Sequence, residues 1–151
     1  MNKVSATKNK HGFTIVELLV VIVVIGILVG ITIVSYGAIQ QRARDSERSS
    51  DVTQLKIALE KYHADNGQYP AVCTVDNAAC VISLLSGPLA PYLSNIPHDP
   101  KYSADSGSDY RYVRTPLSLD GYGIRVVYEA KPMCMTGQNV SAGWWSSIPI
   151  C

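Results

Sequence analysis

One carboxylate stands inside a long apolar stretch near the beginning of this chain. Glu17 is the single charged residue between Phe13 and Val34, and its neighbours are mostly Val, Ile and Leu. An acidic side chain at the centre of a membrane helix costs roughly 2.5–3.5 kcal/mol, so a function is expected of it. A buried carboxylate takes up a proton unless a cation lies beside it. Glu17 therefore predicts either an ion pair with a cationic partner or an unpaired carboxylate near the membrane surface, where the N-terminal end of a helix favours a negative charge.

Four cysteines form the second group of residues with a chemistry of their own. Cys73, Cys80, Cys134 and Cys151 are even in number and all lie in the C-terminal part, which indicates disulfides and an oxidising compartment. Four cysteines allow three pairings. We predict the pairing that is local in sequence, Cys73–Cys80 and Cys134–Cys151, because the second bond ties down a tail that would otherwise fray.

No catalytic constellation is found in the sequence. His11, His63 and His98 are scattered, and the chain has no CxxC pair, no Gly-rich phosphate loop and no Ser/His/Asp grouping. The net charge is +1, and without residues 1–12, which hold three lysines, ten basic side chains face twelve acidic ones, or −2. This balance is not typical of a nucleic-acid binder. We therefore predict neither an enzyme nor a nucleic-acid partner.

The apolar stretch that carries Glu17 must be a helix if it lies in lipid. From Phe13 to Val34 it spans roughly 33 Å at about 1.5 Å per residue, enough for a hydrocarbon core of about 30 Å. Only a helix satisfies its own backbone there, so length overrides the β-branched composition. The run is too long for an ordinary signal peptide. A plain membrane anchor stays open as an alternative, because hydropathy alone does not exclude it.

The helix is predicted to continue beyond the apolar run. Val52, Leu55, Leu59 and Tyr62 recur at helical spacing and predict a stripe that faces a core. Charged residues occupy the other faces, where Arg44 and Glu47 are spaced as an i,i+3 pair of small value. Asn66-Gly67, with Pro70 beyond it, predicts the end of the helix.

A small domain with little helix is predicted after Pro70. Val81 to Leu85 predicts a brief helix that Ser86-Gly87-Pro88 breaks. Tyr110 to Arg114 and Tyr122 to Tyr128 predict the two strands of an antiparallel hairpin. The tail from Lys131 to Cys151 is rich in Gly, Ser and Pro, and we predict an irregular loop there.

Two blocks of sequence resemble a known family. The first is Gly12-Phe13-Thr14-Ile15-Val16-Glu17-Leu18-Leu19 after a basic leader, and the second is Leu59-Glu60-Lys61-Tyr62 with Asp65-Asn66-Gly67-Gln68-Tyr69-Pro70. Both are similar to type IV prepilins and type II secretion pseudopilins. The resemblance implies an α+β, pilin-like fold: one long N-terminal helix, membrane-spanning in its first half and amphipathic in its second, packed on a small antiparallel β-sheet with a disulfide-stapled C-terminal loop.

The resemblance also implies how the chain is processed and divided. A prepilin peptidase would cut between Gly12 and Phe13 and methylate the new terminal residue, so residues 1–12 are a cytoplasmic leader that is removed. Residues 13–34 are then the transmembrane and fibre-core helix, 35–66 the amphipathic helix and 67–151 a small extracytoplasmic domain. Many members carry a proline where this chain has Val34, so the usual kink is not predicted from the sequence.

Assembly into a fibre gives Glu17 the cation it needs. In the family the partner is the N-terminal amine of a neighbouring subunit, within a homo-oligomeric helical filament built on an inner-membrane assembly platform. Some major pseudopilins also bind calcium in a loop comparable to residues 99–109. Here Asp99, Asp105 and Asp109 could supply carboxylate oxygens, and the alternative is a solvated polar loop with no metal and no other cofactor.

The orientation follows from the cysteines rather than from the lysines. Three basic residues lie near each end of the apolar run, Lys3, Lys8 and Lys10 before it and Arg42, Arg44 and Arg48 after it, so the positive-inside rule does not decide. The cysteines place the C-terminal part outside. We therefore expect a single-pass protein of the cytoplasmic membrane, whose C-terminal domain lies outside, and then an extracellular or periplasmic filament.

Three functions compete at this point. The first is the structural subunit of a type IV pilus or related filament. The alternative is a pseudopilin of a type II secretion system, or the subunit of a competence filament for DNA uptake. The third is a membrane-anchored extracellular binding module, for which Trp144-Trp145 is the one candidate platform.

Overall fold

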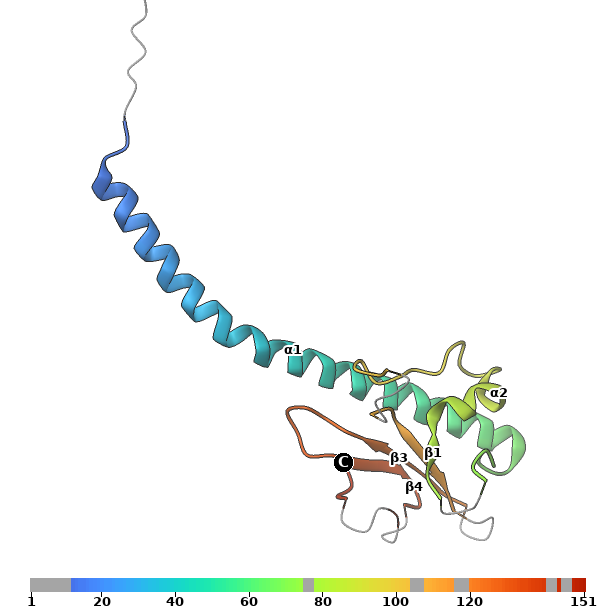
Figure 1. Ribbon diagram of the computed structural model, residues 1–151. Helices are drawn as coiled ribbons and strands as arrows, with labels where there is room; N and C mark the ends of the chain where they lie inside the picture. The colour runs from blue at the N-terminus through green and yellow to red at the C-terminus, as the bar shows by residue number, and fades with distance from the viewer. Residues whose placement is uncertain (1–11, 75–77, 104–107, 116–119, 141–143, 145–147) are drawn as a thin grey trace, which may run out of the picture. The chain divides into compact units, whose positions relative to one another are not determined.

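The computed structural model describes residues 12–74, 78–103, 108–115, 120–140, 144 and 148–151 (Figure 1). The chain forms two compact units, Met1–Ile39 and Gln40–Cys151. Helix α1, Ile15–Asn66, runs through both of them. The leader that we predict over residues 1–12 lies outside the described residues apart from Gly12.

The first unit consists of the apolar part of α1. The prediction of a helix over this β-branched run is confirmed, and the helix is long and apolar enough to cross a membrane. Its large apolar side chains from Phe13 to Ile31 are exposed, with exposed fractions from 48% at Val24 to 87% at Ile15. Such a surface needs lipid or other protein around it.

The later part of α1 belongs to the second unit and buries one stripe. Val52, Leu55 and Leu59 are buried, and Tyr62 packs against them, which confirms the predicted core stripe. The helix ends at Asn66, and Gly67 follows with φ +70°. The Gly67 N–H donates to the His63 carbonyl at 2.7 Å. Glycine takes this left-handed conformation without a Cβ clash, as the sequence predicts for the residue after the helix.

A four-stranded antiparallel sheet completes the second unit. Its strands are β1 (Cys80–Val81), β2 (Arg111–Arg114), β3 (Tyr122–Val126) and β4 (Cys134–Gln138), in the order β1-β2-β3-β4. The predicted hairpin is confirmed as β2 and β3, with Tyr112 opposite Ile124. These two residues belong to the same buried cluster as Leu55 and Leu59. One face of the sheet therefore packs on α1, and the fold is α+β and pilin-like.

Two local predictions are wrong. Ser86-Gly87-Pro88 does not break the helical segment: a 3-10 helix, η1 (Ile82–Leu85), runs directly into a short helix, α2 (Ser86–Leu89). A proline in a first helical turn removes only an N–H that has no partner there. The tail is also not all irregular, because β4 pairs with β3 along its whole length. Cys134–Gln138 has no alternating apolar pattern, so tertiary pairing, with β3 and by a bridge from Met135 to Ile150, defines this strand.

Candidate functional site

The start of α1 carries a reciprocal pair of hydrogen bonds between Thr14 and Glu17. Oε2 of Glu17 accepts from the Thr14 N–H at 2.8 Å and from the Thr14 Oγ1 at 2.7 Å. The Glu17 N–H donates back to Thr14 Oγ1 at 3.2 Å. This is a capping box, in which the residue before the helix and the third helical residue satisfy each other's orphan donors. We did not predict a role for Thr14, although the Thr-x-x-Glu spacing is a recognisable signal for it.

The capping box leaves Glu17 with room for a second partner. Both bonds from Thr14 reach Oε2, and Oε1 accepts no bond from any residue that the structure describes. Gly12 and Phe13 lie just before the helix in exposed, non-helical backbone. Exposed backbone of this kind is where proteases cleave. The geometry thus presents an accessible peptide bond and, four residues later, a carboxylate with a free oxygen.

A second cluster of charges lies in the second unit and centres on Arg48. Its side chain is 2% exposed. Nε and Nη2 donate to the two oxygens of Asp99, at 2.6 and 3.0 Å, in a bidentate pair. Nη1 donates to Asp45 at 2.7 Å and to Glu129 at 3.1 Å. One guanidinium therefore joins α1 to the loop around Asp99 and to the turn after β3.

Asp45 and Glu129 extend this cluster through the turn between β3 and β4. Burial opposes the ionised form of Asp45, but the N–H groups of Glu129 and Ala130, at 2.9 and 2.8 Å, together with Arg48 hold its pKa below the ordinary value. Glu129 also receives bonds from Arg44 at 2.6 Å and Lys101 at 2.7 Å. Arg44 first, and then Lys101, hold the pKa of Glu129 well below its usual range.

The sequence predicts that the charged residues of α1 lie on its solvent-exposed faces, and the structure corrects this prediction for two of them. Asp45 and Arg48 are 4% and 2% exposed. The predicted Arg44–Glu47 pair is wrong, because Arg44 pairs with Glu129. Periodicity shows which residues share a helix face, but the carboxylates of Asp99 and Glu129, which cover Arg48, lie 51 and 81 positions further along the chain.

These carboxylates predict how the second unit responds to acid. The pKa values of Glu129 and Asp45 are lowered in the folded state, so the unfolded chain binds protons first. Their contribution is complete above pH of about 4.5, the ordinary pKa of Glu, and is lost as the pH falls below it. We expect the free energy of unfolding, measured with urea and tryptophan fluorescence in detergent, to fall below this pH. Burial raises the pKa of Asp51 and acts in the opposite direction.

Glu129→Gln is the control for this acid response. The amide keeps the shape of the side chain but does not titrate, so the loss of stability in acid should become shallower. An identical pH profile for the wild type and the variant would contradict the assignment of the response to Glu129.

Two of the three candidate calcium ligands have protein partners. Asp99 pairs with Arg48, and Asp109 accepts from the Asp99 and Tyr110 N–H groups at 3.1 and 2.9 Å and lies 2.7 Å from His98 Nδ1. Asp105 lies outside the described residues. Among those that are described, no three His, Cys, Asp or Glu side chains gather as a metal site would require. The calcium hypothesis stays an untested prediction, and the structure adds no support for it.

The cysteines pair as Cys73–Cys80 and Cys134–Cys151. The second bond joins the first residue of β4 to the last residue of the sequence. Near it, Trp144 is 5% exposed and packs against Val113 and Met135. Trp144 is therefore a core residue and not an exposed platform, and Trp145 lies outside the described residues.

The fold and the start of α1 together define a class, the pilin-like filament subunits. The family described as the prokaryotic N-terminal methylation motif matches residues 7–33. Type II secretion system core protein G of Escherichia coli (strain K12) is 31% identical over 115 residues, which cover 70% of this chain and 72% of that protein. The chain belongs to this prepilin and pseudopilin family.

Two further relatives extend the similarity over nearly the whole chain. The core protein G of Klebsiella pneumoniae is 27% identical and covers 92% of this chain and 96% of its own length. The core protein G of Pectobacterium carotovorum subsp. carotovorum is 26% identical, covering 91% and 86%. No solved structure is found to match the chain.

Proposed function

We propose that this chain is a pseudopilin, the subunit of a filament that serves a type II secretion system. The observation that carries the filament is the exposed apolar part of α1 with Glu17 inside it. A plain anchor needs the apolar surface and the capping bonds to Thr14, but it has no use for a charge on the second, free oxygen of Glu17. A helical bundle of copies uses both the surface and the charge, because neighbours cover the apolar side chains and supply a cation.

The relatives favour one of the filament interpretations that the sequence left open, namely the type IV pilus, the type II secretion system and the competence filament. Our first interpretation was a type IV pilus subunit, and the secretion pseudopilin was the alternative. The three relatives described above are all type II secretion system core protein G. They favour the alternative, which we adopt. The extracellular binding module loses its main support because Trp144 is buried.

The proposed sequence of events begins at the membrane. A prepilin peptidase removes residues 1–12 at the cytoplasmic face and methylates Phe13. Residues 13–34 hold the subunit in the membrane, while residues 35–66 and the domain of residues 67–151 lie outside. An inner-membrane assembly platform then moves the subunit into the filament. There the free Oε1 of Glu17 accepts from the Phe13 amine of a neighbour, and the bond to Thr14 holds the carboxylate in place.

Expression with a prepilin peptidase and an assembly platform tests this function. We expect thin filaments that shear from the cells and contain this chain, together with secretion of a reporter exoprotein that depends on it. If the chain forms filaments but secretion of the reporter does not depend on it, the result would support the type IV pilus interpretation instead. A chain that stays in the membrane under all conditions would favour the plain anchor.

Processing gives a separate and sharper prediction. Mass spectrometry of the membrane-extracted protein should show a first residue of Phe13 carrying one methyl group. Gly12→Ala should be tolerated better than Gly12→Leu, because a bulky residue before the cut keeps the backbone out of the peptidase. An intact Met1 in assembled protein, or a cut after the apolar run, would contradict the proposal.

A further inference from the structure

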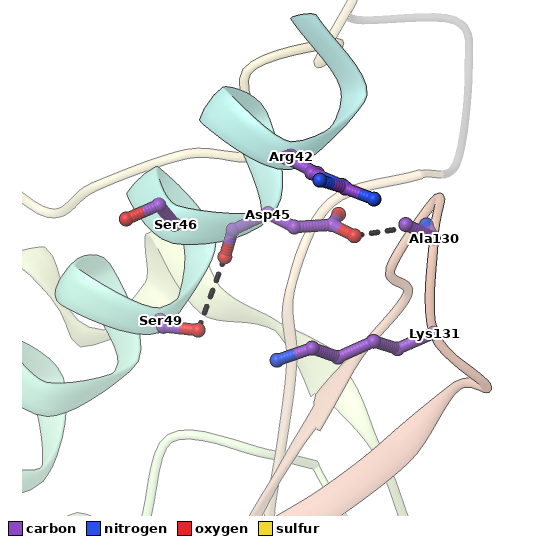
Figure 2. A pocket seen from close by; sticks show the side chains of 6 residues that line it. All are labelled: Arg42, Asp45, Ser46, Ser49, Ala130 and Lys131. Atoms are coloured by element: carbon purple, nitrogen blue, oxygen red, sulfur yellow. Dashed lines mark hydrogen bonds between the residues drawn. The ribbon is translucent and has the colours of Figure 1, made fainter. Parts of the chain in front are cut away.

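A charged cleft opens in the second unit between α1 and the turn that joins β3 to β4 (Figure 2). Its volume is about 510 Å³. Four lining residues come from α1 and two from the turn: Arg42, Asp45, Ser46 and Ser49, with Ala130 and Lys131. Figure 2 shows the side chains of Arg42 and Lys131 on either side of the hydrogen bond between Asp45 and Ala130.

The cleft is held in shape by the same carboxylate that forms its floor. Asp45 accepts from the N–H groups of Glu129 and Ala130, which fastens the turn to the helix. It also accepts from Arg48 at 2.7 Å and is 4% exposed. The negative charge of Asp45 is thus neutralised inside the protein. The charge that the cleft offers to a ligand is positive and comes from Arg42 and Lys131.

These two cations are not paired with acids in the described part of the chain. Arg42 is exposed and makes no hydrogen bond or ion pair there. The ammonium of Lys131 lies 5.6 Å from the centre of the Tyr128 ring, a cation–π contact that leaves its hydrogen-bond donors free. Two cations around one cleft are suited to a carboxylate.

One exposed carboxylate of the chain also has no partner within the described residues and carries the charge opposite to that of the cleft. Among the described Asp and Glu residues, Glu47 alone accepts no hydrogen bond, and its side chain is exposed. It follows Arg42 by five residues, which turns it about 140° around the helix at about 100° per residue. Glu47 therefore does not reach the cleft of its own chain. Its exposed carboxylate is open to a partner outside the chain.

We propose that Glu47 of one subunit enters the cleft of the next and pairs with Arg42 and Lys131. The inference rests on the proposed function, because it needs the chain to assemble. Filaments are built from heterologous interfaces, in which each copy uses one surface toward the copy before it and a different surface toward the copy after it. Arg42 and Glu47, on different sides of one helix, supply two such surfaces with opposite charge.

A charge swap tests the pair in the full chain, with the sheared filament fraction as the readout. Exposed ion pairs are individually weak, so we expect Arg42→Glu and Glu47→Arg each to lower the filament yield by roughly fivefold rather than abolish it. The double variant, with both changes in every copy, should recover to within about threefold of the wild type. Recovery is incomplete because Lys131 still stands in the cleft.

Lys61→Glu is the matched control, an exposed lysine of α1 outside the cleft. Its filament yield should lie within about twofold of that of the wild type, because Lys61 has no partner in the proposed contact. The inference is overturned if single variants assemble normally, if the double variant is no better than the worse single one, or if Lys61→Glu is equally harmful. A wild-type chain that never assembles would overturn the proposed function and this inference together.

Discussion

Glu17→Ala should accumulate in the membrane and form no filaments. Removing the charge makes insertion easier, by up to roughly 2.5–3.5 kcal/mol if the residue reaches the membrane centre. In the filament, the same change leaves the amine of the neighbouring Phe13 without its carboxylate. Breaking a buried pair on one side costs about 3–5 kcal/mol, which corresponds to at least a hundredfold loss of assembly. The measurement is the ratio of sheared to membrane-bound protein on immunoblots.

Two variants separate the charge of Glu17 from its place in the capping box. Thr14→Ala removes the hydroxyl that donates to Glu17 but keeps the carboxylate. The loss of this cap should destabilise the start of the helix by about 0.5–2 kcal/mol. Its filament yield should fall much less than that of Glu17→Ala. Glu17→Gln retains an oxygen acceptor without the charge, and we expect it to behave like Glu17→Ala. Normal filaments from Glu17→Ala would instead support the plain membrane anchor.

The sequence was sufficient for those parts of the fold that local patterns determine. The stripe of Val52, Leu55 and Leu59 predicts the buried face of α1, and Asn66-Gly67 predicts its end, because both depend on neighbours within one or two helical turns. The hairpin of β2 and β3 follows from two apolar segments joined through Asp120-Gly121. β4 was missed because its residues have no pattern of their own and are ordered by pairing with β3.

The same difference, between local sequence patterns and contacts of distant segments, explains which site residues the sequence predicts and which it does not. Glu17 is conspicuous because a charge in an apolar run is costly wherever the chain goes. Thr14 was overlooked beside it, although its spacing from Glu17 was readable. The cluster around Arg48 was beyond sequence reasoning, since nothing local indicates that Asp99 and Glu129 return to α1. Charges on a helix are predicted as solvated, and only the tertiary fold buries them.

Arg48→Met should destabilise the second unit more than any other single change in the cluster. It leaves Asp99, Asp45 and Glu129 without the cation that joins them, and the first two are almost fully buried. Removing one partner from a buried ion pair costs about 3–5 kcal/mol, because the remaining charges are desolvated and uncompensated. The free energy of unfolding from urea titrations of the full chain in detergent, followed by tryptophan fluorescence, measures the loss.

Three comparisons show whether that loss comes from the charges. Arg42→Met removes an exposed arginine six residues earlier on α1 and should change the stability by less than about 0.5 kcal/mol. Arg48→Lys keeps the charge but not the bidentate bond to Asp99, so its stability should lie between those of Arg48→Met and the wild type. Asp99→Asn in the Arg48→Met background removes one stranded charge and should restore part of the stability. If Arg48→Met is no less stable than Arg42→Met, the buried pair contributes nothing net, and the packing of α1 on the sheet alone holds the loop around Asp99.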